Sequence, residues 1–141
     1  MARRSIVQED TVGLIEKRLI KQGREEWVPA AEKELQELTG ASTTYEVDWD
    51  SFSSDAEALN NLQNQGLRRI TNAIRVICRD ELGKEAVHES IKKIVVKNVA
   101  SPAEKSILVK DGAAWVQGAW AKGGEGYFTD RDIQLSLEKQ I

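Results

Sequence analysis

Hydrophobic and polar residues alternate with a helical period through the first part of the chain. Apolar residues spaced by three and four positions predict one helix over residues 9–22 and a second over residues 25–39. Gly23 is expected to end the first helix and Gly40 the second, because glycine is the preferred residue just past a helix end. We therefore expect residues 1–40 to form a helical N-terminal segment.

The pattern then changes from a strand to a long helix. Residues 43–50 alternate between apolar and mostly acidic positions, which is the period of a half-buried strand. A capping box begins at Ser54 and opens the longest apolar stripe of the chain, which predicts a single amphipathic helix over residues 55–82. Gly83 is expected to end this helix, with a short helical segment over residues 84–90.

The last third of the chain has the pattern of three strands and a helix. Residues 91–99 are rich in β-branched residues and are apolar on both faces, which is typical of an interior strand. Residues 105–110 and 113–121 form a predicted hairpin around Asp111-Gly112, a strong short-range signal for a tight turn. A final helix is expected to start at Thr129. We expect the last three strands to pair as an antiparallel meander.

These elements occur in the order ααβαβββα. The expected fold class is α+β, with a mixed sheet of about four strands and the long amphipathic helix packed on one face. The chain has 141 residues, and roughly 100–200 residues is the usual span of one domain. We therefore expect residues 1–141 to form a single α+β domain.

Composition narrows the class of protein. Apolar residues make up 40% and charged residues 30% of the chain, as in a folded globular protein. Cys78 is the only cysteine, which argues against a disulfide scaffold. There is no long apolar run and no signal or transit peptide, so we expect a cytoplasmic protein that does not enter membranes.

Charge is unevenly distributed along the chain. The formal net charge is −3, whereas domains that bind nucleic acids usually carry a basic excess. Residues 25–57 hold ten acids and only one base, while residues 60–110 hold ten bases and five acids. These two segments could pair inside one chain or between two copies.

The tryptophans provide the leading functional hypothesis. A two-residue turn at Asp111-Gly112 places Trp115 opposite Leu108, among polar neighbours, on one face of the hairpin. An aromatic anchor within a polar rim is typical of a protein interface. We expect a non-enzymatic protein–protein interaction domain that self-associates as a homodimer through Trp115 and Leu108, with Trp120 at the margin. The alternative is that a helix covers this face.

A second hypothesis uses the acidic cluster over residues 46–57. Asp48, Asp50 and Asp55 could hold a divalent cation, since carboxylates are the ligands of hard cations. The chain would then be a cation-dependent enzyme or a binder of phosphorylated ligands. The phosphate would be held by arginines on the predicted long helix, which are Arg68, Arg75 and Arg79. The simpler interpretation is a solvated strand face opposite a solvated helix face.

The third hypothesis is nucleic-acid binding through the same arginine stripe of the helix over residues 55–82. Residues 53–114 contain no Phe, Trp or Tyr, so this face offers no base stacking. His88 is the only histidine, and Cys78 lies on the apolar stripe, so neither suggests a catalytic pair. We therefore expect no catalytic residue and no cofactor.

Overall fold

The computed structural model describes residues 13–141 and has the expected α+β fold with a mixed, four-stranded sheet. The strands are β1 (Thr44–Val47), β2 (Lys93–Asn98), β3 (Ser106–Lys110) and β4 (Ala113–Gly118). Their order across the sheet is β1-β2-β4-β3. β2 runs parallel to both β1 and β4, and only β3 is antiparallel to its neighbour.

The expected antiparallel meander is wrong, because β4 rather than β3 lies beside β2. After β2, the short 3-10 turn η4 (Pro102–Glu104) leads the chain into β3 at the edge of the sheet. The hairpin then returns β4 into the gap between β2 and β3. Val95 and Val96 of β2 are both buried, as expected for a strand with a neighbour on each side.

The hairpin itself is as predicted. Lys110 pairs with Ala113, and Asp111 and Gly112 between them both have positive φ angles, of 53° and 79°. Two central residues with positive φ make the mirror-image turn whose twist matches that of the two strands. The turn therefore fixes the register of β3 against β4.

The N-terminal segment is one continuous helix in the described residues, with α1 (Leu14–Gln22), the π-helical turn η2 (Gly23–Trp27) and α2 (Val28–Thr39). Residues 9–12 of the predicted first helix lie outside the described residues. Gly23 does not end a helix: its backbone is helical, and a Cβ there would lie 2.5 Å from the ring of Trp49. Gly40, with a φ of 68°, ends α2 as predicted.

The predicted long helix ends earlier than expected. It comprises α4 (Ala56–Asn61), the π-helical turn η3 (Leu62–Leu67) and α5 (Arg68–Ile77). Its N-cap is Asp55 rather than Ser54, since a carboxylate oxygen of Asp55 accepts the Ala58 N–H at 3.0 Å. A separate helix, α6 (Glu81–Ser90), begins before Gly83 because Asp80 caps it.

The first strand is also shorter than predicted. β1 ends at Val47 because the carboxylate of Asp48 accepts the Ser51 N–H and so starts a short helix, α3 (Trp49–Phe52). Asp48 and Asp50 therefore do not lie on the strand face that the sequence pattern gave them.

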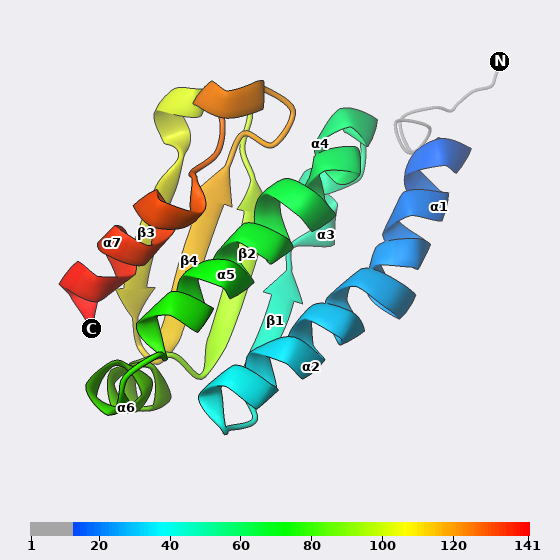
Figure 1. Cartoon of the computed structure of the whole chain (residues 1–141). Helices are drawn as coiled ribbons and strands as arrows, with labels where there is room; N and C mark the ends of the chain where they lie inside the picture. Colours follow the sequence, from blue (N-terminus) through cyan, green and yellow to red (C-terminus); the bar gives the residue numbers. More distant parts are fainter. Residues whose placement is uncertain (1–12) are drawn as a thin grey trace, which may run out of the picture.

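Three helices cover one side of the sheet. Figure 1 shows α2, α5 and the final helix α7 (Asp130–Gln140) in front of the strands. Thr129 caps α7, as predicted. The buried core fills the space between this helical layer and the near face of the sheet, and includes Ile74, Ile94, Val116 and Leu137. The last turn before α7 is the 3-10 segment η5 (Gly123–Glu125).

Candidate interaction surface

The far face of the sheet carries the side chains of alternate strand residues, pointing away from the helices. Among residues 13–141, no helix packs against this face (Figure 1). We call it the open sheet face. It consists of Thr44, Glu46, Lys93, Val95, Lys97, Ser106, Leu108, Lys110, Ala113, Trp115 and Gln117.

An apolar row crosses the middle of the open sheet face. The strand register places Val95, Trp115 and Leu108 side by side on three neighbouring strands. Trp115 is 43% exposed and Leu108 is 50% exposed, whereas Val95 is almost fully covered. A buried aliphatic residue beside two exposed large ones makes a continuous apolar surface with a raised aromatic ring.

Lysines surround this apolar row. Lys93, Lys97 and Lys110 lie on the open sheet face, with Glu46 as its single acid. Glu46 ends the row on β1, and a carboxylate oxygen of Glu46 lies 3.3 Å from Lys93 Nζ. The open sheet face is therefore basic in a chain whose net charge is −3.

The outer edge of β3 is closed by a side chain from α7. The amide of Gln140 accepts the Val109 N–H at 2.7 Å and donates to the Ile107 carbonyl at 3.1 Å. These two bonds reproduce those that a neighbouring strand would make. Occupying backbone groups of an edge strand in this way hinders its pairing with another strand.

The outer edge of β1 is closed in the same manner by α2. The carboxylate of Glu32 accepts the Tyr45 N–H at 2.9 Å, and the Gln36 side chain donates to the Thr43 carbonyl at 3.1 Å. At each edge, side chains from the neighbouring helix thus occupy one backbone N–H and one backbone C=O.

Trp120 is not part of this surface, so its prediction as a contact residue is corrected. β4 ends at Gly118, and the chain then turns so that Trp120 lies fully buried. Its ring N–H donates to the Lys97 carbonyl at 3.0 Å, and its ring stacks on Tyr127. Strand alternation could not place this side chain because the strand had already ended.

The three aspartates proposed as metal ligands do not form a cluster. Within the described residues, no group of three or more His, Cys, Asp or Glu side chains could hold a metal ion. Asp48 and Asp55 act as N-caps of α3 and α4, and Asp50 lies in the first turn of α3. The carboxylates of Asp48 and Asp55 each accept a hydrogen bond from a backbone N–H of the helix that they cap.

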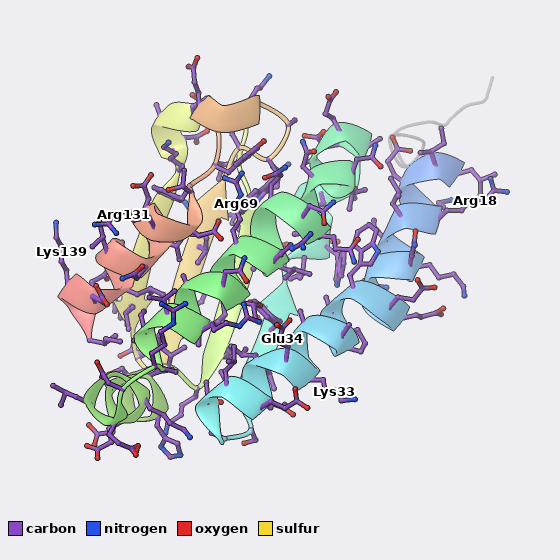
Figure 2. The ribbon with its side chains drawn as sticks, viewed as in Figure 1. Arg18, Lys33, Glu34, Arg69, Arg131 and Lys139 are labelled. Atoms are coloured by element: carbon purple, nitrogen blue, oxygen red, sulfur yellow. The ribbon has the colours of Figure 1, made fainter. Side chains whose placement is uncertain are left out.

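The predicted arginine stripe is not a free surface either. The Arg75 guanidinium is paired with Glu34 of α2, and it also contacts the Asn72 side chain. Figure 2 shows Glu34 on the side of α2 that faces α5. Arg68 is exposed at the start of α5, and Arg79 lies beyond its end. The structure therefore does not bring the three predicted arginines to one open site.

Sequence reasoning overlooked Arg69, which joins α5 to the segment before α7. Its guanidinium donates to the Phe128 carbonyl at 3.1 Å and lies over the Tyr127 ring. Arg69 Nε also lies 3.8 Å from Oδ1 of Asp130. Together with the contacts of Arg75, these bonds show that the polar side of α5 packs between α2 and α7.

The acidic and basic segments meet within one chain at two places, through the pairs Glu34–Arg75 and Glu46–Lys93. A groove of about 430 Å³ between α1 and α3 also mixes charges, since Lys17, Lys21 and Arg24 line it together with Glu25 and Asp50. Lys21 Nζ already lies 2.9 Å from Oε2 of Glu25, with which it forms an ion pair. This groove offers no single sign of charge to a ligand.

Neither Cys78 nor His88 adds chemistry to the surface. Burial raises the pKa of the Cys78 thiol above its ordinary value, which disfavours the thiolate that acts as a nucleophile. His88 is exposed near the end of α6, and its backbone carbonyl accepts a hydrogen bond from Lys92.

Comparisons of the chain with protein-family models, with curated proteins and with solved structures find no match. Among residues 13–141, no helix is both long and apolar enough to cross a membrane. The structure places Trp115 beside Leu108 as the sequence predicted. Val95 and Lys97 were missed, because their place on this surface depends on β2 lying next to β4.

Proposed function

We propose that this chain is a non-enzymatic protein–protein interaction domain that binds its partner through the open sheet face. The observation that carries this proposal is the pair Trp115 and Leu108. These two large apolar side chains lie opposite each other on adjacent strands, and both remain substantially exposed. Lysine and amide side chains surround them, which is the arrangement of an apolar core within a polar rim.

The energy available from this pair is substantial. At 43% and 50% exposure, the two side chains present roughly 200 Å² of apolar surface, and burying it is worth about 5 kcal/mol at ~25 cal/mol per Å². Association costs offset part of this gain. Trp115 is therefore the residue whose truncation should weaken binding most, as tryptophan is enriched among the residues that dominate interface energies.

Photo-crosslinking tests the proposal directly. A photoreactive phenylalanine analogue is placed at Leu108 in the full-length chain, and the matched control carries it at Leu135, an exposed apolar position on α7. We expect protein adducts from position 108 that disappear when Trp115→Ala is added. Position 135 should give fewer adducts and should not respond to that substitution.

Two results would contradict the proposed function. One is the absence of adducts from position 108, and the other is equal labelling from positions 108 and 135. The Trp115 side chain is partly exposed and lies on the open sheet face. Trp115→Ala should therefore leave the fold intact. Far-ultraviolet circular dichroism of the variant checks this before the crosslinking result is interpreted.

A further inference from the structure

We infer that the partner of the open sheet face is an acidic polypeptide segment, bound in an extended conformation with one apolar side chain on Trp115 and an acidic side chain toward the lysines on either side. This inference rests on the proposed function, since it names the chemistry of the partner for the same surface. It is carried by the sign of the charge on the face and by the order of charged and apolar residues along the strands.

The lysines of the open sheet face outnumber its acids. Lys93, Lys97 and Lys110 share the face with the single acid Glu46, whose carboxylate lies 3.3 Å from Lys93 Nζ. Among residues 13–141, no carboxylate lies within ion-pair distance of Lys97 or Lys110. Both of these lysines are exposed. An acidic partner therefore gains ion pairs on this face, whereas a basic partner meets like charges.

Two aspartates lie at the margin of the face, beyond the ends of the strands. The carboxylate of Asp48, which follows β1, accepts the Ser51 N–H. Asp111 occupies the hairpin turn next to Lys110. Within the described part of the chain, neither aspartate forms an ion pair with a lysine of the face. The positive charge of Lys97 and Lys110 is therefore left for a partner.

Charged and apolar residues form three successive rows across the strands. The strand register puts Lys93 and Lys110 in the first row, on either side of the small, buried Ala113. The apolar row that contains Trp115 comes next, and Lys97 lies in the row after it. Neighbouring rows are two residues apart along each strand, which is about 6.7 Å. Lysines therefore lie on both sides of the apolar row.

An extended polypeptide has the same spacing, because its side chains on one face are also about 6.7 Å apart. A segment lying over β4, with its direction close to that of the strands, presents an acidic, an apolar and an acidic side chain to the three rows in turn. Its apolar side chain packs against Trp115 and Leu108. One acid comes within reach of Lys110, in the space above Ala113, and the other comes within reach of Lys97.

The composition of the face favours a polypeptide over a single-stranded nucleic acid. Trp115 is the only aromatic residue of the face, whereas proteins that hold such strands stack successive bases on several aromatic rings. The other members of the apolar row are the aliphatic residues Val95 and Leu108. Glu46 ends the same row on β1 and repels a phosphate backbone.

A nuclear magnetic resonance titration of the full-length chain with a synthetic peptide tests this inference. The peptide has seven residues, with aspartate second, leucine fourth, aspartate sixth and serine elsewhere. The control peptide has the same composition and charge, with the aspartates third and fifth, so that in an extended chain they point away from the face that carries the leucine.

We expect the first peptide to shift the resonances of β2, β3 and β4 and of the Trp115 indole N–H. The face covers roughly 300 Å², well below the ~800 Å² per partner of a standard stable interface. The dissociation constant should therefore lie in the high micromolar to millimolar range. The control peptide should bind at least about threefold more weakly, since its acids do not reach the lysines.

Substitutions on the face should weaken binding of the first peptide. Trp115→Ala should raise the dissociation constant about fivefold or more. Lys97→Ala and Lys110→Ala should each raise it about two- to fivefold. Lys33→Ala is the matched control and should leave it unchanged, because Lys33 is an exposed lysine of α2 in the helical layer (Figure 2).

Glu46→Gln should have the opposite effect. It removes the single acid of the face and releases Lys93 from its ion pair, so the dissociation constant should fall about two- to fivefold. This gain and the losses in the lysine variants should all diminish when the salt concentration rises from about 50 mM to about 500 mM. A dissociation constant that Glu46→Gln leaves unchanged or raises overturns the selection of an acidic partner.

The other results separate this inference from the proposed function. If millimolar peptide causes no shifts while crosslinks from position 108 still require Trp115, the acidic partner is wrong and the proposed function stands. Equal binding of the two peptides overturns the extended arrangement. If a single-stranded oligothymidine shifts the same resonances at lower concentration than the peptide does, the face binds nucleic acid, and both the inference and the proposed function are overturned.

Discussion

Gly83 provides a sharp test of how α5 and α6 are joined. It is the third residue of α6, and its N–H donates to the carboxylate of Asp80 at 2.7 Å. A Cβ at this position would lie 1.9 Å from the Ile77 carbonyl oxygen at the end of α5. Real Cβ atoms do not come within 3.0 Å of such an atom. Gly83→Ala must therefore move one helix relative to the other.

The sign of the effect decides between two explanations of this glycine. If only helix propensity mattered, alanine would stabilise α6 by about 1 kcal/mol. The steric overlap is with a backbone oxygen, which cannot rotate away, and overpacking of this kind costs roughly 1–3 kcal/mol or more. We expect a net loss of about 1–3 kcal/mol in the free energy of unfolding. The melting temperature should fall by roughly 3 °C for each kcal/mol.

Urea unfolding followed by far-ultraviolet circular dichroism measures this difference. Gly124→Ala is the matched control, because no atom lies within 4 Å of the Cβ it would add and its φ is not positive. It should change stability by less than about 0.5 kcal/mol. If Gly83→Ala is as stable as the parent chain or more stable, the close approach of α6 to Ile77 is refuted.

Three further predictions concern an edge, a buried hydroxyl and a cap. Gln140→Ala should cost under about 1 kcal/mol but increase light scattering at high protein concentration more than Gln134→Ala does, since the Gln134 side chain hydrogen-bonds to Glu138 on its own helix and not to a strand. Equal scattering would contradict the role of Gln140 at the edge of the sheet. Burial raises the pKa of Tyr45 well above its ordinary value, so the folded state holds this proton more tightly than the unfolded state does. Stability should therefore be undiminished below about pH 10 and fall above it. Urea midpoints of Tyr45→Phe should fall less steeply over this range, and parallel curves would refute the assignment. Asp55→Ala should lose about 1–2 kcal/mol through its cap, equally with and without Mg²⁺; a thermal shift by Mg²⁺ that requires Asp55 would revive the metal hypothesis.

The edges and the open face of this sheet differ in what they expose: side chains occupy backbone groups at the edges, whereas the face exposes apolar side chains. Gln140 on one edge and Glu32 on the other occupy backbone groups that would otherwise pair with any extended chain. The face keeps Trp115 and Leu108 exposed. Side-chain packing on a face depends on shape and charge, whereas backbone pairing at an edge accepts many sequences. Association through the face is therefore the more selective of the two modes.

Local sequence determined several elements because their chemistry is complete within a few residues. Asp111 and Gly112 adopt positive φ, and this fixed the hairpin and placed Trp115 opposite Leu108. Gly40 ended α2, and Thr129 capped α7, for similarly local reasons. The candidate contact pair was predictable for the same reason, since it needs only the register of one turn.

Tertiary structure decided what depends on residues far apart in the chain. The position of β4 beside β2 is a choice among sheet orders that strand patterns do not distinguish, and it brought Val95 next to Trp115. Gly23 and Gly83 read as helix ends in the sequence, but they make room for Trp49 and for the Ile77 carbonyl. Close approach of distant segments leaves no local signature, because a glycine that ends a helix and one that makes room have the same sequence pattern.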